Sequence, residues 1–584
     1  MGVKMSGKFV KIRSLLFAVS FLALAALSMM ILTMTNNGKK EEEGGHLPFS
    51  LIYRQGGMSH RLKGFWAEDT VYFCIPGSLS LEKISLDMET AEYLLFDGGQ
   101  LSDGDALSQV ELNRVYEAVC SGTDGRGGEN DGKTSIPVIF MQGSRLPVIR
   151  LTTASGSMEA VNADKGYSEA GFLEVYDADG NMETAVKVER LSGRGNTSWD
   201  AAKKSYAVKL EDAENVLGMG AAKRWVLNAN YYDGAYIRNQ IGFELARESG
   251  MRFTPEERFA EVYINDEYAG LYQLMEKIEP GKNRMDIGNG YLLEVDYIER
   301  SVEEQYILLT NEQPVVIHAP EKNCDLDGVQ QFFDAFTADM ENGNTAEAMG
   351  RLDVESFAKR FVMEEILQDM DFGYTSQYLY LDLKNGILHD GPLWDLDNTM
   401  GRGIAVEAQD FFVTGYDLNY NNVSRWYAVF YSQPAFRKLV WQEYTEHFRP
   451  AMLALTEGGI EAKTAEIEAS IAMDQILFPA PRSVFMTDAS LEEHTAHLTG
   501  YLQDKMNLMD EYLCADLTDT VMEIVLPKTE VKEVPPEMMP VQEETDRGEY
   551  GLVHVIMEYR FPAVLLVMCG AGMLLWYLCK RTGK

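Results

Sequence analysis

The stretch from residue 371 to 401 constrains the fold most, because its pattern is that of a β-hairpin. Residues 377–383 ("QYLYLDL") alternate strand-forming side chains, and residues 387–394 ("ILHDGPLW") return after Asn385-Gly386. An Asn-Gly dipeptide between two such runs is the strongest short-range signal for a two-residue hairpin turn. The segment therefore predicts two antiparallel strands that are joined by a tight turn.

This hairpin would bring distant polar residues together. With a two-residue turn, Ser376 faces Asp395 across the mouth of the hairpin, with side chains about 5 Å apart. Asp371 lies five residues before Ser376, in the loop that enters the first strand. The pattern therefore predicts that Asp371, Ser376 and Asp395 meet at one site.

The order of these residues resembles that of a kinase catalytic centre. There, a catalytic aspartate is followed by a metal-binding side chain, a hairpin and a metal-binding aspartate. By position, Asp371 is the candidate base that accepts the proton of a substrate hydroxyl, and Asp395 is the metal ligand. The literal Asp-Phe-Gly at residues 371–373 precedes the hairpin instead of following it, so we interpret that match as chance.

The charge of the chain excludes one class of partner. The 584 residues include 90 acidic and 52 basic side chains, a formal net charge of −38. A nucleic-acid surface needs clustered Lys and Arg, so no nucleic-acid partner is predicted. A uniformly acidic surface instead keeps a protein soluble. The six cysteines form no CxxC pair, which indicates neither a disulfide framework nor a zinc ribbon.

Two apolar segments predict membrane spans. Residues 15–34 are uncharged, mostly apolar and long enough to cross a bilayer as a signal anchor, with a cleaved signal peptide as the alternative. Residues 561–579 form the second segment. Basic residues in the tails 1–14 and 580–584 place both tails in the cytoplasm by the positive-inside rule. We expect the main domain to lie on the extracytoplasmic side of the cell membrane, anchored at both ends.

The region between these segments changes character along the chain. Residues 47–135 contain short apolar runs broken by Gly, Ser and Asp, which predicts a small β-rich module. Residues 136–515 begin with strand-like segments and then become helical, with apolar periods that predict helices at 236–249 and after an Asp353 cap. Residues 516–560, rich in Glu, Pro and Val, predict a stalk. Sheet first and helices later indicates an α+β chain with a two-lobed main domain.

Six motifs occur in an order that resembles the spore-coat protein H (CotH) family of kinase-like proteins. They are "GRGNTSW" (193–199), "KKSYAVKL" (203–210), "WVLNANYYDGAYIRNQIGFELA" (225–246), "VYINDEYAGLYQLMEKI" (262–278), "YLLEVD" (291–296) and "GPLWDLDNTMG" (391–401). The resemblance covers about residues 136–515. It implies an atypical protein-kinase fold that binds ATP and a divalent metal, Mg²⁺ or Mn²⁺. It also implies phosphorylation of Ser or Thr in a protein substrate of the spore coat or cell surface.

The resemblance also assigns roles to single residues. Carried over by motif, Asp371 is the catalytic aspartate and Asp395 the metal aspartate, with Asp397 close by. Many members of the family have Asn where Ser376 stands. A hydroxyl is a weaker metal ligand than an amide carbonyl, so this departure bears on the second metal position.

Phosphoryl transfer also needs cations around the nucleotide phosphates. A two-glycine turn and the strand after it carry Arg194, Lys203, Lys204 and Lys209, which are candidate nucleotide-binding residues. Backbone amides freed by the glycines could approach phosphates as well. The alternative interpretation is an ordinary surface turn with solvated lysines.

Three further residues complete the predicted nucleotide site. A kinase-like lysine on this strand would be held by a helix carboxylate, for which Glu244 and Glu276 are the candidates. Arg238, at the start of the predicted helix, is either a phosphate-binding arginine or part of the scaffold.

Two other functions stand beside the leading hypothesis of a membrane-anchored protein kinase. ATP is scarce outside the cytoplasm, so the domain could instead be a catalytically weak or inert nucleotide-binding surface scaffold or adhesin. The "DLD" at 395–397 also matches the DxD signature of metal-dependent glycosyltransferases, although two carboxylates at that spacing often arise by chance.

Overall fold

The computed structural model describes residues 47–96, 99–121, 133–301, 304–310, 312–369, 371–401, 413, 422–479, 486 and 489–515. Both predicted membrane segments, both tails and the predicted stalk lie outside these residues. Within the described ranges, no helix combines the length and the apolar character that crossing a bilayer requires.

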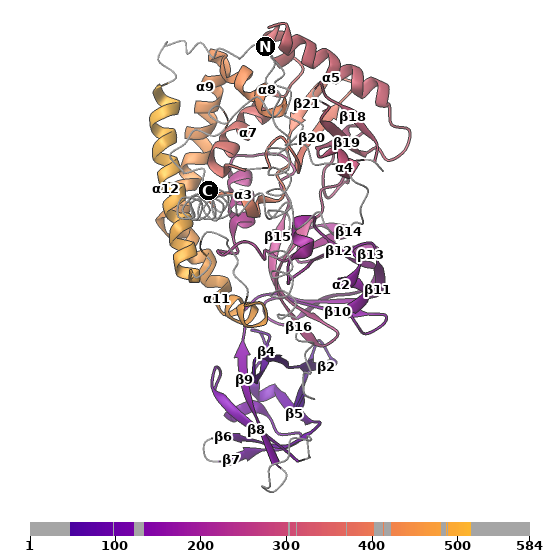
Figure 1. Ribbon diagram of the computed structural model, residues 1–584, viewed down its shortest axis with the longest axis vertical. Helices are drawn as coiled ribbons and strands as arrows, with labels where there is room; N and C mark the ends of the chain where they lie inside the picture. The colour runs from indigo at the N-terminus through magenta and orange to yellow at the C-terminus, as the bar shows by residue number, and fades with distance from the viewer. Residues whose placement is uncertain are drawn as a thin grey trace, which may run out of the picture.

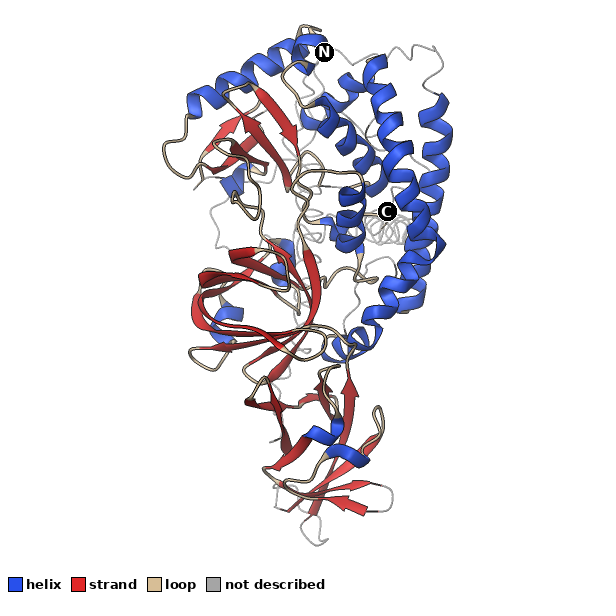
Figure 2. Cartoon of the chain, turned by 180° about the vertical axis from the view of Figure 1, so that it is seen from behind, coloured by secondary structure: helices blue, strands red, loops and turns tan. Residues whose placement is uncertain are grey.

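Strands dominate the first half of the described chain and helices the second, which confirms the predicted α+β class. Figure 2 shows the strands gathered along one side and at the narrow end, while most of the long helices form a column on the other side and the helix Leu326–Glu341 lies above the strands at the wide end. Three sheets are present in the described residues.

The N-terminal module forms the narrow end of the molecule (Figure 1). Its sheet has the order β3-β4-β9-β8-β6-β7, and its core stacks Phe73 between Phe49 and Phe140 at ring-centroid distances of 4.8 and 5.5 Å. The predicted boundary after residue 135 falls inside β9. The strand bounds are β3 Phe65–Ala67, β4 Thr70–Ile75, β6 Ala91–Phe96, β7 Gly99–Leu101, β8 Val115–Ser121 and β9 Lys133–Gln142.

The large sheet has the strand order β14-β13-β12-β11-β10-β15-β16-β2-β1-β5. Because β14 pairs with both β13 and β16, the strands from β10 to β16 close into a ring. Strands β1, β2 and β5 extend this sheet from the module. The bounds are β1 Phe49–Gln55, β2 Met58–Lys63, β5 Ile84–Met88, β10 Val148–Thr153, β11 Ser168–Tyr176, β12 Met182–Arg194, β13 Ser205–Asn215, β14 Ala221–Asn228, β15 Glu257–Ile264 and β16 Glu267–Glu276.

The small sheet contains the predicted hairpin, in a register that differs from the expected one. Its order is β18-β19-β17-β20-β21. Asp382 pairs with Ile387, so residues 383–386 form the turn and the loop is two residues longer than predicted. The bounds are β17 Tyr291–Val295, β18 Tyr306–Leu308, β19 Pro314–Ala319, β20 Gln377–Asp382 and β21 Ile387–Asp390.

The side chain of Asp382 explains the longer turn. Its carboxylate accepts hydrogen bonds from the backbone N–H of Asn385 at 3.2 Å and from the Asn385 side-chain amide at 2.6 Å. Such an Asx turn competes with the two-residue turn that Asn-Gly favours. Gly386 takes the left-handed φ of 68° that closes the loop. Strand pairing ends before Ser376, which therefore does not face Asp395 across the ladder.

Both predicted helices are present, as α3 and α7, and α7 begins directly after Asp353. In Figure 1 the helices α7, α9, α11 and α12 run alongside one another. The helix bounds are α2 Glu159–Ala163, α3 Arg238–Glu248, α4 Ile298–Ser301, α5 Leu326–Glu341, α6 Thr345–Met349, α7 Val354–Leu367, α8 Asn422–Tyr431, α9 Pro434–Glu443, α10 Arg449–Ala454, α11 Ile460–Leu477 and α12 Leu491–Ala515.

Helix α11 joins the helical column to the large sheet through two buried polar contacts. The Asp474 carboxylate lies 2.8 Å from the Lys203 ammonium, and both side chains have no exposed surface. One turn earlier, the Ser470 hydroxyl donates a hydrogen bond to Glu261 of β15 at 2.7 Å. Burial is the main cause that raises the pKa of Glu261 from its ordinary 4.5 to about 8.

We expect the Lys203–Asp474 pair to stabilise the fold. Asp474→Asn leaves a buried ammonium without its counter-charge, which costs about 3–5 kcal/mol of unfolding free energy. The double variant Lys203→Met/Asp474→Asn should be more stable than the sum of the two single losses implies, because it buries no unpaired charge. Urea unfolding of the four proteins measures this coupling.

The exposed pair of Lys209 and Glu189, 2.6 Å apart, provides the matched control. Lys209→Met should cost less than about 1 kcal/mol, because solvent screens a surface ion pair. Strictly additive losses in the buried pair would contradict the expectation.

Glu261 should make stability fall as pH rises. Its pKa is higher in the folded state, so the folded protein binds an extra proton between about pH 4.5 and 8. Within that window, stability should fall with increasing pH by up to about 1.4 kcal/mol per pH unit from this group. Glu261→Gln cannot ionise at this position. The melting temperature of the variant minus that of the unsubstituted protein should therefore increase from pH 5 to pH 9. Glu82→Gln, which removes an exposed carboxyl, is the matched control.

Candidate active site

Asp371 lies in the turn between α7 and β20. The backbone N–H groups of Tyr374 and Thr375 donate to the Asp371 carbonyl at 2.9 and 3.1 Å. The Asp371 N–H donates to the carboxylate of buried Asp369 at 3.0 Å. Gln368, with a left-handed φ of 49°, ends the helix just before this turn. These bonds fix the backbone that carries the half-buried Asp371 side chain.

Asp395 is an exposed residue between two buried neighbours, Trp394 and Leu396. Its backbone is left-handed, with φ of 62°. The Leu396 N–H donates to the side-chain oxygen of Asn239 in α3 at 2.9 Å. Gly242 lets α3 approach closely, since a Cβ there would lie 2.3 Å from a Leu396 methyl carbon. Packing on both sides therefore holds a solvent-accessible carboxylate in place.

Asp371 and Asp395 share one electrostatic environment. Burial is the largest cause that raises the pKa of Asp395; the Arg194 guanidinium lowers this pKa, and the Asp371 and Glu294 carboxylates raise it further. Because Asp395 keeps solvent contact, the burial effect reflects protein atoms that surround its other sides. Carboxylates that repel one another favour a cation close to both.

Arg194 reaches this environment from the large sheet. It stands at the end of β12, and its guanidinium lies over the Trp394 ring at 5.3 Å from the centroid. This stacking contact joins the large sheet to the segment that carries Asp395. Of the four cations predicted on the turn and strand, Arg194 is the one whose charge lowers the pKa of Asp395.

Ser376 and Asp397 are both half-buried. Asp397 lies in the short 3-10 helix η4, Leu396–Asn398. Ser376 precedes β20 and has a left-handed φ of 57°. Asn adopts this conformation more readily than Ser does, so the backbone shape here suits an Asn side chain.

The three predicted lysines contact other groups. Lys203 is fully buried in the ion pair with α11 and also donates to the Ala229 carbonyl at 3.1 Å. The Lys204 ammonium lies 4.4 Å from the centroid of the Trp199 ring and donates to that residue's carbonyl at 2.6 Å. Lys209 forms the surface pair described above. Lys203 is thus a buried cation that is paired with a helix carboxylate.

The two acids that we expected to hold the strand lysine have other partners. Glu244 of α3 pairs with Lys463 of α11, and Glu276 at the end of β16 pairs with Arg284. Lys209, the lysine on β13, pairs with Glu189 instead, and Asp474 of α11 pairs with Lys203 just before that strand. The expectation of Glu244 or Glu276 is thus corrected. The neighbouring strand β12 supplies the acid for Lys209, and the packing of α11 brings a more distant acid to Lys203.

Arg238 is buried at the start of α3 and forms an ion pair with buried Asp233. Its guanidinium also donates to the carbonyls of Thr399 at 3.0 Å and Met400 at 3.5 Å. These contacts fix the segment that follows Asp395. Of the two predicted roles for Arg238, they match that of a scaffold arginine.

Several charged residues near the acidic pair carried no sequence signal. Arg300 of α4 lowers the pKa of Asp395. The pKa of Lys165 is lowered mainly by burial, and Arg300 and Arg194 lower it further. Lys277, after β16, also has a pKa lowered mainly by burial, with Arg194 among the further causes. Glu294 of β17, bonded to His318 at 2.6 Å, lies within the "YLLEVD" motif, which alone could have directed attention to it.

The donor set fits a single divalent ion. Within the described residues, no three His, Cys, Asp or Glu side chains gather closely enough to hold a metal by themselves. Mg²⁺, however, is usually held by one or two carboxylates while substrate phosphates and water complete its shell. Exposed Asp395, with Asp371 in the same electrostatic environment and Asp397 two residues further on, suits that kind of site.

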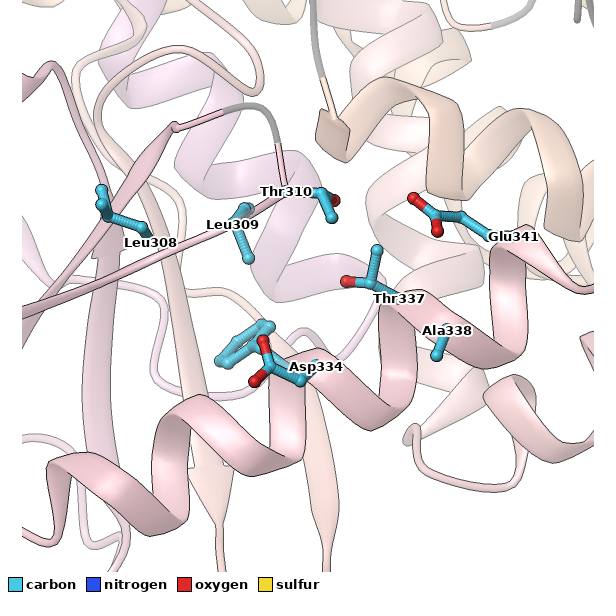
Figure 3. Close-up of a pocket in the computed structure, with 8 residues that line it drawn as sticks. Leu308, Leu309, Thr310, Asp334, Thr337, Ala338 and Glu341 are labelled. Carbon is cyan, nitrogen blue, oxygen red and sulfur yellow. The ribbon is translucent and has the colours of Figure 1, made fainter. Parts of the chain in front are cut away.

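A shallow pocket of about 240 Å³ lies elsewhere, between α5 and the segment after β18 (Figure 3). Its polar lining consists of the carboxylates of Asp334 and Glu341 and the hydroxyls of Thr310 and Thr337. Two carboxylates without a cation in the lining repel a phosphate. The pocket therefore does not suit a nucleotide, and the candidate active site remains at Asp371 and Asp395.

Comparison with known families agrees with the motifs quoted above. No curated protein matches the chain significantly. The family model described as "CotH kinase protein" matches residues 191–509, more than half of the chain, and this range contains Arg194, Asp371 and Asp395. The chain therefore belongs to the CotH kinase protein family.

Proposed function

We propose that this protein is an ATP-dependent kinase that phosphorylates Ser or Thr residues of a protein at the cell surface. The observation that carries the proposal is the shared environment of Asp371 and Asp395, with Arg194 reaching it from the large sheet. Membership of a kinase family supports the same reaction class. In this proposal the large sheet and the small sheet with its helices are the two lobes of a kinase-like fold.

In the proposed reaction, Asp371 orients the acceptor hydroxyl and takes its proton as the hydroxyl oxygen attacks the γ-phosphorus of ATP. The bond between the γ-phosphorus and the bridging oxygen breaks, and ADP leaves. Asp395, with Asp397, would hold the divalent ion, and Arg194 would contact the phosphates. A bound Mg²⁺ or Mn²⁺ would neutralise the phosphate charge.

The backbone at the site supports a functional role. Asp395 and Ser376 both have left-handed φ values, 62° and 57°. A non-glycine residue in this region costs of order 1–3 kcal/mol and persists only where its surroundings enforce it. Other non-glycine residues of the described chain, such as Glu68 and Leu217, share this conformation, so it fits a functional role at Asp395 and Ser376 without singling them out.

We also propose that the two terminal segments anchor the protein to the cell membrane. The described domains would then face the extracytoplasmic side. Protease treatment of intact cells would digest this region if it lies outside, and would spare it if it lies in the cytoplasm.

Asp395→Ala should abolish phosphoryl transfer, because it removes the exposed carboxylate that the proposal assigns to the divalent ion. Full-length protein with labelled ATP and Mn²⁺ should yield phosphoprotein, and the variant should not. Asp327→Ala, which removes an exposed acid of α5, is the control and should remain active. Stabilisation by ATP and metal without any transfer would favour a nucleotide-binding scaffold. Stabilisation by a nucleotide sugar, and not by ATP, would favour a glycosyltransferase.

Asp371→Asn should separate catalysis from binding. The amide cannot accept the hydroxyl proton, so the transfer rate should fall by about a hundred- to ten-thousandfold. Thermal stabilisation by ATP with Mn²⁺ should persist, since Asp395 is intact. If both properties were lost together, Asp371 would be a metal ligand rather than the base.

A further inference from the structure

The catalytic loop lacks a strong second ligand for metal. Protein kinases hold two ions between the aspartate after the hairpin and an amide side chain of the catalytic loop. Ser376, at the corresponding place in the motif order, offers only a neutral hydroxyl. The described residues also contain no group of three His, Cys, Asp or Glu side chains that could hold a metal. A second ion would thus lack the amide ligand that protein kinases use.

Arg300 is fixed beside this position. One of its terminal nitrogens donates to the hydroxyl of Thr375, the neighbour of Ser376, at 3.0 Å, and lies 3.4 Å from Asp296. Thr375 itself donates to the same Asp296 oxygen at 2.6 Å. The guanidinium also lies over the Tyr297 ring, 5.0 Å from its centroid. These contacts hold the arginine against the catalytic loop from two sides.

Arg300 also acts electrostatically on Asp395, although its described contacts are to Asp296, Thr375 and Tyr297. The Arg300 charge lowers the pKa of Asp395. Burial and the Asp371 carboxylate raise the pKa of Tyr297 to about 12, and Arg300 acts against this rise. About a third of the Arg300 side chain is exposed. Both described hydrogen bonds of its guanidinium come from a single nitrogen, Nη1. A guanidinium has further donors in a planar fork that matches two phosphate oxygens.

We infer that Arg300 takes the place of a second metal ion. Its guanidinium contacts the ATP phosphates from the side of Ser376, while a single divalent ion is held at Asp395. The inference rests on the proposed kinase function and names the residue that completes its phosphate site. A structural alternative is that Arg300 only clamps the catalytic loop through Thr375.

Metal counting tests the inference directly. Full-length protein is titrated with Mn²⁺ and a non-hydrolysable ATP analogue, and electron paramagnetic resonance reports the number of bound ions and any coupling between two of them. We expect one Mn²⁺ per protein–nucleotide complex, with the spectrum of an isolated ion. Two coupled ions in the unsubstituted protein would overturn the inference.

Nucleotide affinity, measured by calorimetry, gives the second readout. Arg300→Gln should weaken binding of the analogue about tenfold or more, because it removes a charge-assisted contact to phosphate. The metal count should stay at one. Arg300→Lys keeps the charge and should recover part of the affinity. Arg258→Gln, which removes a similarly exposed arginine that also pairs with one carboxylate, should bind normally.

A compensating variant separates the two roles of Arg300. Ser376→Asn/Arg300→Gln restores an amide ligand where the arginine charge is lost, so it should bind a second Mn²⁺ and regain nucleotide affinity. If Arg300 acts only as a clamp, Arg300→Gln will lower the melting temperature and leave the affinity unchanged, which overturns the inference. Failure of every variant and of the unsubstituted protein to bind Mn²⁺ and nucleotide would overturn the proposed function itself.

Discussion

A buried ion pair between Asp233 and Arg238 fixes the backbone that follows Asp395. The Asp233 carboxylate accepts from the backbone N–H groups of Ala235 and Arg238, at 3.0 and 2.8 Å, as well as from the guanidinium. Arg238 then reaches the carbonyls of Thr399 and Met400. Breaking a buried pair leaves an uncompensated charge, so the arrangement tolerates little change. The position of Asp395 thus depends on residues that never meet a substrate.

The site itself brings carboxylates and guanidinium groups into one electrostatic environment. Asp371 and Glu294 raise the pKa of Asp395, whereas Arg194 and Arg300 lower it. The two arginines come from different parts of the fold, β12 of the large sheet and α4 beside the small sheet. A ligand that carries both a metal ion and phosphates matches these mixed charges better than a purely cationic or a purely anionic ligand does.

Sequence reasoning succeeded where the signal was local. The apolar periods of α3 and α7, the existence of the hairpin and the α+β class followed from neighbouring residues. The register of the hairpin did not, because the Asp382 side chain captures Asn385 and lengthens the turn. The acid that holds Lys203 depends on how α11 packs, which no pattern along the chain reveals. Arg300 was missed for the same reason, since only the folded chain brings it to the catalytic loop.

The closed ring of the large sheet needs more of the chain than the family model matches. The family match begins at residue 191, within β12, yet the ring also needs β10 and β11, which stand between β12 and β15 in the sheet. A recombinant fragment trimmed to the match would open the ring and expose two unpaired strand edges, which invite aggregation. The range that matches the family model is therefore shorter than the range that the hydrogen-bonded sheet needs to fold.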